Sequence, residues 1–303
     1  MKVHMKKFVL RVLFFLLPAL FVLVGIETFI RSLPNGYKYK DGWMWENGHR
    51  VSTLILGNSH GYYGLSPSFM GDSVFNLCFV SQRLEHDFFL LNRYAKVLTA
   101  LKRVVLVVDN SNLFDMPMEV DESGRVTYYQ LYMGYRAHSM LSKYGFELAN
   151  MPYIKQKLQS YMQYGAVQCD SLGWGNNYTV DKRSPVDFKY ENVRQHRFVN
   201  WTYTYRNRDY MDSVAAWCQQ RNIQLILVQT PVCRDYTKKA DAWQLQLVNA
   251  MTDSCCVQYG ARKLDYSCDS RFQDLDFYDS DHLSDRGARR FSFILKDTLA
   301  TKK

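Results

Sequence analysis

Ser59 is a candidate nucleophile because of its place in the sequence. It follows a short strand-forming run at residues 53–56, and glycines at positions 57 and 61 bracket it. Such a run is typical of a strand that is buried on both faces of a parallel sheet. Open α/β folds bind their ligands at the carboxyl ends of these strands. We therefore expect the Ser59 hydroxyl at a ligand-binding edge, the alternative being an ordinary turn between a strand and a helix.

A histidine and an aspartate near the end of the chain have the chemistry to take a proton from a serine. His282 lies in a loop before the last expected helix, and Asp279 precedes it by three residues. At this spacing the carboxylate can curl back and accept a hydrogen bond from the imidazole, which fixes the tautomer and stabilises the imidazolium. Asp281, the immediate neighbour, is expected to point elsewhere. Without Ser59, His282 would be interpreted as a surface histidine beside a helix.

Alternating strands and helices are predicted around these residues. Apolar runs indicate strands, and apolar residues at three- and four-residue steps indicate helices. The predicted strands are residues 53–56, 73–78, 103–108, 223–228 and 261–266, and the predicted helices are 84–101, 211–221, 236–253 and a last one that begins near Ser284. A strand, a helix and a strand in succession imply a right-handed parallel crossover. The pattern predicts a three-layer α/β/α sandwich with a mainly parallel sheet, with Ser59 and His282 at the same edge.

Residues 113–205 interrupt this alternation. Twelve tyrosines fall between Tyr128 and Tyr205. One interpretation is a tyrosine-rich insertion that packs on the main domain. The other is a cap whose aromatic faces and hydroxyls line a groove for sugar rings, because these side chains combine apolar area with a polar group.

The amino-terminal region predicts a membrane anchor. Residues 12–26 carry no charge, and the apolar stretch extends back to Phe8 if the Arg11 side chain reaches the headgroups. A helix of this length can cross roughly 30 Å of hydrocarbon. Basic residues precede the stretch, so the amino terminus is expected in the cytoplasm and the rest of the chain on the exported side. A cleaved signal peptide and a buried core helix are the alternatives; the residues after Val24 offer a poor cleavage site.

Composition excludes several classes of function. The chain has 303 residues, 47% hydrophobic and 22% charged, and a net charge of +9, but its basic residues are scattered and form no stripe. We therefore expect no nucleic-acid partner. The seven cysteines follow no metal-ligand spacing, and their odd number prevents complete pairing within one chain. No metal or cofactor site is predicted.

The segment from Gly57 to Gly61 also matches the nucleophile-elbow pattern of α/β-hydrolases. That fold places several strands before its serine, and here only about twenty residues separate the anchor from the first strand. It also takes its acid and its histidine from separate loops. This assignment is therefore set aside.

The arrangement instead resembles the SGNH (GDSL-like) hydrolase superfamily. Members carry Gly-Asp-Ser on the first strand and Asp-x-x-His before the last helix, similar to residues 57–59 and 279–282 here. The resemblance covers roughly residues 51–111 and 211–298 and is greatest to membrane-anchored, exported branches that act in alginate acetylation and in D-alanyl transfer to teichoic acid. It implies that Ser59 is the nucleophile, His282 the base and Asp279 the residue that orients it.

The resemblance also implies an oxyanion hole, and here the sequence departs from the family. The donors would be Ser59, the backbone N–H of Cys78 in place of a glycine, and the side chain of Asn110 or Asn112, where the family has Gly-x-Asn-Asp. Losing one such donor costs about 3 kcal/mol of transition-state stabilisation. A slow site, or one adapted to acyl transfer, is expected.

The sequence thus predicts three regions: a cytoplasmic stub and anchor at residues 1–30, a connector at 31–50, and an SGNH-like domain at 51–303 with a cap at about 113–205. The expected function is transfer of an acyl group, most simply acetyl, through Ser59 to a surface glycan or to water. The resemblance implies an acyl donor and a membrane-bound O-acyltransferase as partners, and no cofactor. The alternatives are a plain carbohydrate or lipid esterase, and a glycan-binding or assembly protein without turnover.

Overall fold

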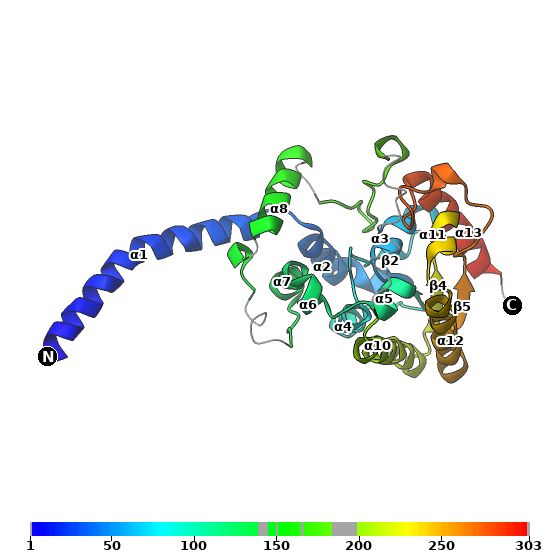
Figure 1. Ribbon diagram of the computed structural model, residues 1–303, viewed down its shortest axis with the longest axis horizontal. Helices are drawn as coiled ribbons and strands as arrows, with labels where there is room; N and C mark the ends of the chain where they lie inside the picture. Colours follow the sequence, from blue (N-terminus) through cyan, green and yellow to red (C-terminus); the bar gives the residue numbers. More distant parts are fainter. Residues whose placement is uncertain (1, 139–144, 150, 165–166, 184–198, 302–303) are drawn as a thin grey trace. The chain divides into compact units, whose positions relative to one another are not determined.

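A computed structural model describes residues 2–138, 145–149, 151–164, 167–183 and 199–301 (Figure 1). The chain divides into two compact units, each built from two stretches of sequence. The first unit comprises residues 1–38 and 124–167, and the second comprises residues 39–123 and 168–303. All the residues that the sequence analysis assigned to chemistry lie in the second unit.

The second unit is built on a five-stranded sheet in the order β2-β1-β3-β4-β5, and every neighbouring pair is parallel. The strands are β1 (Thr53–Leu56), β2 (Val74–Asn76), β3 (Arg103–Val107), β4 (Gln224–Gln229) and β5 (Arg262–Asp265). Each lies within two residues of a predicted strand at both ends. The order changes direction at β1, which pairs with both β2 and β3. Ligands of open parallel sheets bind at such a point, so the end of β1 is the expected place for a site.

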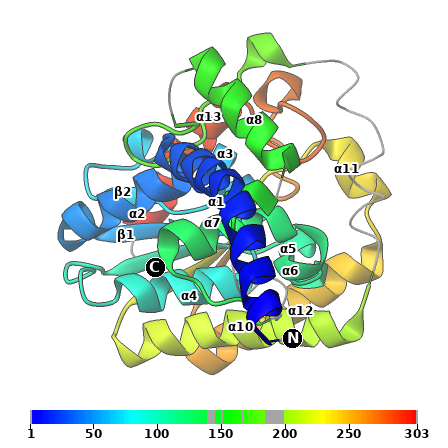
Figure 2. The same ribbon diagram turned by 90° about the vertical axis from the view of Figure 1, so that its left-hand side faces the viewer.

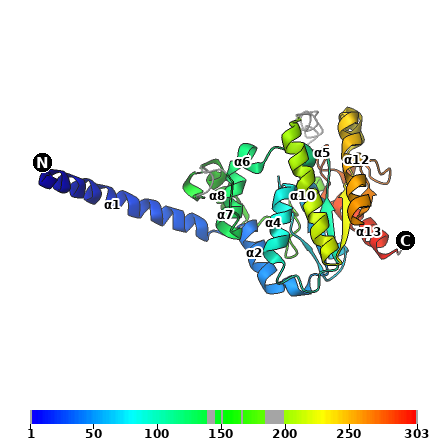
Figure 3. The same ribbon diagram turned by 90° about the horizontal axis from the view of Figure 1, so that it is seen from below.

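Helices cover both faces of the sheet (Figures 1 and 2). On one face α10 (Trp201–Gln220) packs against α4 (Leu84–Tyr94) and α12 (Ala242–Tyr259), and these three lie side by side in Figure 3. On the other face α13 (Asp285–Ala300) packs against α3 (Ser59–Gly64). The predicted three-layer α/β/α sandwich with a mainly parallel sheet is confirmed.

A row of side chains that runs across three neighbouring strands forms the core beneath α13. Ile55, Val105 and Ile226 are register partners on β1, β3 and β4, and none is exposed to solvent. They belong to the same buried cluster as Phe291 and Leu295 of α13. Because each fully buried side chain of this size contributes about 1.5–3 kcal/mol, this row fixes α13 on the sheet. The loop that precedes α13 carries His282, so the row also fixes its position.

Shorter elements complete the fold. They are α2 (Gly36–Asn47), η1 (Gly48–Arg50), η2 (Pro67–Phe69), α5 (Asn110–Phe114), α6 (Met118–Asp121), η4 (Val180–Lys182), α11 (Arg234–Lys239) and η6 (Asp274–Asp276). The helix α2 occupies most of the region that the sequence analysis treated as a connector. Its Trp43 ring stacks on Phe75 of β2, with centroids 3.9 Å apart.

Three predicted helices differ from the observed ones. The helix expected at 84–101 ends at Tyr94, and the one expected at 236–253 is divided between α11 and α12. The helix expected at 211–221 begins ten residues earlier, at Trp201, because the Asn200 side chain accepts the Thr202 N–H and caps it. The last helix begins after its predicted N-cap, Ser284, whose hydroxyl accepts the Gly287 N–H.

The first unit contains the predicted anchor within α1 (Lys2–Ser32). The stretch Met5–Ser32 has 28 residues and contains an 18-residue window with a mean hydropathy of 2.7, so by length and composition it is able to cross a membrane. The rest of this unit is formed by α7 (Ser123–Met133), η3 (Glu147–Ala149) and α8 (Met151–Tyr164). Glu27, near the end of α1, accepts the backbone N–H groups of Glu147 and Leu148, both at 3.0 Å.

Several tyrosines of the predicted insertion pack within the first unit. The Tyr37 ring contacts those of Tyr128 and Tyr129, with centroids 5.2 and 5.0 Å away. Buried Lys157 pairs with Glu147 at 2.6 Å. These contacts agree with the packing interpretation for this part of the insertion, whereas Tyr144 and Tyr190 lie outside the described residues. The predicted boundaries of the cap remain a prediction.

Candidate active site

The turn after β1 presents Ser59 at the edge of the sheet. Gly57 has a φ of 132°, which L side chains rarely adopt, and a Cβ there would lie 2.8 Å from Val107 Cβ. Asn58 then caps α3, because its side chain accepts the His60 N–H at 3.0 Å. Ser59 therefore lies at the carboxyl end of β1, as the sequence predicts, and it is the first residue of the short helix α3, which the sequence analysis did not predict.

The structure brings the Ser59 hydroxyl together with His282 and Asp279. His282 Nε2 lies 2.8 Å from Ser59 Oγ. On the other side of the ring, His282 Nδ1 lies 3.0 Å from each oxygen of Asp279. The same carboxylate accepts the His282 backbone N–H at 2.8 Å. Asp279 thus holds both the backbone and the ring of the histidine, with Nε2 directed at the serine.

The loop around His282 is closed by its own backbone. The Tyr278 N–H donates to the His282 carbonyl, and the Ser284 N–H donates to the Asp276 carbonyl, both at 2.9 Å. The glycine at position 287 is required here, because a Cβ on Gly287 would lie 1.9 Å from the Asp276 oxygen. The start of α13 can therefore approach this loop closely and fix the histidine.

The electrostatic surroundings of His282 make its imidazole a stronger base. Burial by itself would lower the pKa of His282, but the negative charges of Asp281 and Asp279 outweigh it, so the pKa is raised above its usual value. The charge of His60 opposes this rise. A base that is hydrogen-bonded to a hydroxyl and oriented by a carboxylate is the arrangement needed to activate a serine.

The prediction that Asp281 points away from the site is wrong. Its side chain is 2% exposed, with one oxygen 3.6 Å from His282 Nδ1 and the other 3.4 Å from His60 Nε2. The loop curls so that both Asp279 and Asp281 face inward, which sequence spacing alone does not show. His60 in turn bonds through Nδ1 to Asp109, at the end of β3.

The sequence analysis did not identify His60 or Asp109 as site residues. One signal was available, since His60 follows the candidate serine and Asp109 ends the neighbouring strand. The carboxyl ends of parallel strands meet at one edge, so these residues could have been placed together.

Two of the predicted oxyanion donors are already engaged. The Cys78 N–H donates to Asn76 Oδ1 at 3.0 Å. The side-chain amide of Asn112 donates to the Val107 carbonyl at 2.8 Å, and its oxygen accepts the Asp109 N–H at 3.0 Å. The prediction for Cys78 is therefore corrected, because a bonded N–H is a poorer donor to an oxyanion than one without a partner. Asn112 has a structural role in capping α5.

Two other predicted donors remain available. Asn110 Oδ1 accepts the Tyr236 hydroxyl at 3.1 Å, which leaves its Nδ2 to face the opposite side. Within the described part of the chain, neither Asn110 Nδ2 nor the Ser59 N–H makes a hydrogen bond. The Ser59 N–H is also in the first turn of α3, where backbone donors have no partner in the helix. The geometry therefore favours Asn110 over Asn112.

Stacked tyrosines stand beside the catalytic histidine candidate. The ring of Tyr178 stacks between Tyr63 and Tyr278, with centroid distances of 3.7 and 3.9 Å. Tyr63 and Tyr178 each meet the His282 ring edge-on, at 5.8 and 5.6 Å. Trp174 Nε1 donates to the Tyr63 carbonyl at 2.7 Å. Part of the predicted insertion, at Trp174 and Tyr178, thus contributes to the surroundings of the site.

One group of side chains also has the donor types of a metal site. His60, Asp281 and His282 each offer a ligand atom, and these atoms lie within 4.8 Å of one another. A metal ion there would replace the hydrogen bonds through which His60 faces Asp281 and His282 faces its partners. The observed hydrogen bonds and a bound metal ion therefore exclude each other at this position.

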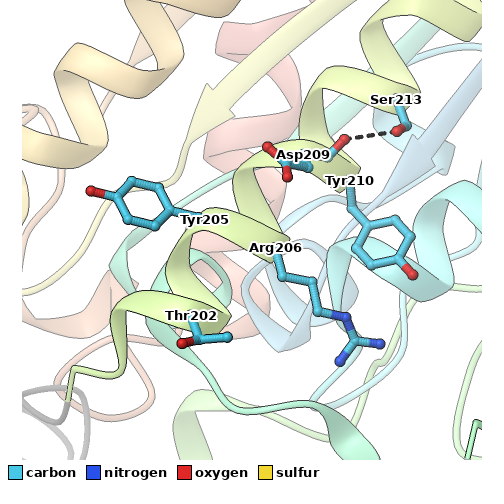
Figure 4. A pocket seen from close by; sticks show the side chains of 6 residues that line it. All are labelled: Thr202, Tyr205, Arg206, Asp209, Tyr210 and Ser213. Atoms are coloured by element: carbon cyan, nitrogen blue, oxygen red, sulfur yellow. Dashed lines mark hydrogen bonds between the residues drawn. The ribbon is translucent and has the colours of Figure 1, made fainter.

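A separate groove of about 460 Å³ runs along α10 (Figure 4). Arg206 at this groove pairs with Glu85 at 2.7 Å, and Ser213 Oγ donates to the Asp209 carbonyl at 2.7 Å. The groove is lined by Thr202, Tyr205, Arg206, Asp209, Tyr210 and Ser213, none of which belongs to the Ser59 site.

Comparison with solved structures gives only low similarity scores. A GDSL-like lipase from Bacteroides thetaiotaomicron aligns with a TM-score of 0.41 and 12% identity, over 86% of this chain and 97% of that chain. A carbohydrate acetylesterase from Sinorhizobium meliloti aligns with a TM-score of 0.40 and 9% identity, over 82% and 98%. No family model matches the sequence, and no curated protein matches it. The functional conclusion therefore rests on the geometry of the site.

Proposed function

We propose that this protein is an SGNH-type serine enzyme that cleaves or transfers acyl esters, with Ser59 as nucleophile, His282 as base and Asp279 as the residue that orients the base. The observation that carries this proposal is the continuous path from Asp279 to His282 Nδ1 at 3.0 Å and from His282 Nε2 to Ser59 Oγ at 2.8 Å. Hydrogen bonds of these lengths meet the geometric requirement for nucleophile activation.

The reaction follows from that path. Ser59 Oγ attacks the carbonyl carbon of an ester as its proton passes to His282 Nε2. The bond to the leaving alcohol then breaks, His282 returns the proton to the alcohol oxygen, and the acyl group remains as an ester on Ser59. Water or a sugar hydroxyl then gives its proton to His282 and attacks the acyl carbon. Ser59 leaves as the alkoxide and regains the proton from His282.

The tetrahedral intermediates carry a negative oxygen that needs hydrogen-bond donors. We assign this role to the Ser59 N–H and to Asn110 Nδ2, the two predicted donors that make no other hydrogen bond among the described residues. Asn110 is 6% exposed, and Tyr236 fixes its amide, so this donor is held in place before reaction. With Cys78 engaged, this set has one donor fewer than the family pattern, which favours a slow enzyme.

The finer proposal concerns the acceptor and the place of action. The apolar span of α1, preceded by basic residues, supports a membrane-anchored enzyme whose second unit lies on the exported side. The tyrosines stacked beside His282 support a sugar as acceptor, since aromatic rings bind the faces of sugar rings. We therefore propose O-acyl, most simply acetyl, transfer to a cell-envelope glycan. An acyl donor on that side implies a membrane-bound O-acyltransferase partner.

Replacement of the nucleophile tests the proposal. Ser59→Ala should lower hydrolysis of a chromogenic acetyl ester by ~10³-fold or more, because the residues of such a site act as a unit. Ser68→Ala, an exposed serine shortly after α3, should leave the rate unchanged. If Ser59→Ala keeps more than about a tenth of the parent rate at equal folded concentration, another residue carries the chemistry. If neither protein turns over esters but both bind an oligosaccharide, the protein is a glycan-binding one.

A further inference from the structure

His60 lies at the centre of a buried network that joins three elements of the site. It belongs to α3, its Nδ1 bonds to Asp109 at the end of β3, and its Nε2 lies 3.4 Å from Asp281 in the loop before α13. Its side chain is only 4% exposed.

The placement of its partners indicates the charge of this imidazole. A neutral imidazole has one N–H donor, whereas carboxylates, which only accept, face both nitrogens of His60. Both contacts are satisfied only when the ring is doubly protonated. The electrostatic surroundings favour the same protonation state. Burial by itself would lower the pKa of His60, but Asp109 and then Asp281 raise it well above its usual value.

Asp109 is correspondingly held as a carboxylate. Burial would raise its pKa, but the charge and hydrogen bond of His60 outweigh it and lower the pKa. Asn58 Nδ2 donates to the same carboxylate at 3.2 Å, so both residues that flank Ser59 in the sequence bind Asp109. The end of β3 thus holds the nucleophile from both sides.

We infer that His60 is a positioning residue for the proposed reaction: a buried imidazolium, fixed between Asp109 and Asp281, that ties the His282 loop to the nucleophile turn and offsets the negative charge beside His282. The inference rests on the proposed function and extends it to a residue outside the Ser59–His282–Asp279 path. The groups that face His60 are Asp109 and Asp281, with the His282 ring 4.8 Å away by centroids. The Tyr236 hydroxyl of α11 reaches this region through Asn110.

The positive charge of His60 affects how strong a base His282 is. Asp281 and Asp279 stabilise protonated His282, and the cation of His60 opposes them. Without that cation, His282 would be protonated up to a higher pH, and less of it would be the neutral base at pH 7. With His60 present, the pKa of His282 rises less than the two neighbouring carboxylates alone would cause.

Opposite shifts of the pH profile provide the kinetic test. His60→Gln should move the acid limb of kcat/KM for the acetyl ester upward by ~1 pH unit, and Asp281→Asn should move it downward. The double variant, which removes both charges, should lie between them. A purely structural role would lower the rate without moving the limb in opposite directions. The control is His49→Gln, which removes an exposed histidine. Shifts that are equal in direction, or absent, would overturn the inference.

A measurement without turnover separates this inference from the proposed function. The full chain in detergent micelles, with ¹⁵N-labelled histidine and the Ser59→Ala substitution, can be titrated by NMR, with His60 assigned by its loss in His60→Gln. His60 should keep the signals of a doubly protonated ring at pH values where an unperturbed imidazole, whose pKa is about 6.5, has lost its proton. A neutral His60 at pH 7.5 contradicts the inference even if Ser59 is the nucleophile. A charged His60 supports it even if no ester is turned over.

Discussion

At the scale of single residues, the two carboxylates beside His282 have different geometries. Asp279 faces Nδ1 with both oxygens at 3.0 Å and also binds the His282 backbone, whereas the nearer oxygen of Asp281 is 3.6 Å away. Only Asp279 is placed to fix the tautomer. Asp281 acts through its charge and through His60. The assignment of Asp279 as the orienting acid therefore has a direct test.

Asp279→Asn should lower kcat for the acetyl ester by about 10²–10⁴-fold, because an amide in this position can stabilise the wrong tautomer. The measurement is steady-state turnover of folded protein. Asp274→Asn, at a side chain that is 74% exposed, is the matched control and should keep the parent rate. A loss of less than threefold in Asp279→Asn would transfer the orienting role to Asp281.

Sequence reasoning reached some of these residues and missed others for a physical reason. Ser59, His282 and Asp279 could be identified from local sequence patterns. A glycine-flanked serine after a strand, and an aspartate three residues before a histidine, each restrict the conformation of the backbone. The direction of Asp281 depends on how the loop curls. The partners of His60 come from two other parts of the fold, the end of β3 and the loop before α13, and local spacing does not encode such contacts.

At the scale of elements, α4 supports the nucleophile turn through a buried acid. Asp87 is fully buried and accepts a hydrogen bond from the Gln82 side chain, and the Gly57 backbone lies close enough to lower the pKa of its carboxyl group. Burial raises the pKa of Asp87 to about 7. Its folded pKa thus lies above the usual value of about 3.9 in an unfolded chain. The stability that this group contributes is therefore present below about pH 4 and is lost as the pH rises to about 7.

Asp87→Asn should remove this pH dependence. Three pKa units correspond to about 4 kcal/mol, so the variant should unfold at a higher temperature than the parent at pH 8 and at nearly the same temperature at pH 4.5. Thermal unfolding in detergent at the two pH values measures this. Asp72→Asn, at an exposed position, should show no such difference between pH values. An Asp87→Asn protein that is less stable at pH 8 would contradict the account.

The elements themselves were predictable to different degrees. The strands β1, β3 and β4 were located closely because continuous apolar runs are strong signals. The helix α2 was missed because its sequence, with Gly42 and several aromatic residues, lacks a clear helical period. The break between α11 and α12 at Ala240 and Asp241 falls inside a pattern that looked continuous.

At the scale of the whole molecule, the chain combines an apolar span with a unit that carries the proposed chemistry. Residues 5–32 form a helix that is long and apolar enough to cross a membrane. The tyrosines of the insertion divide between the two units: Tyr128 and Tyr129 pack in the first, whereas Tyr178 stands beside His282 in the second. The high number of tyrosines in this part of the sequence does not show which of them pack in the first unit and which lie beside the site.

Acyl transfer and hydrolysis can be distinguished by offering both acceptors. If the protein transfers acyl groups to glycans, an oligosaccharide added with the acetyl ester should become acetylated, and Tyr178→Ala should reduce this product more than it reduces acetate released to water. Mass spectrometry of the oligosaccharide and an acetate assay measure the two products. Release of acetate only, with no effect of the oligosaccharide, would identify a plain esterase.

The central claim is that Ser59 is the nucleophile, and covalent labelling tests it most directly. A serine-directed fluorophosphonate should form an adduct on the tryptic peptide of residues 51–83, and fragmentation should locate it on Ser59. Labelling should be lost in Ser59→Ala and strongly reduced in His282→Gln. An adduct on another residue, or equal labelling of Ser59→Ala, would contradict the assignment.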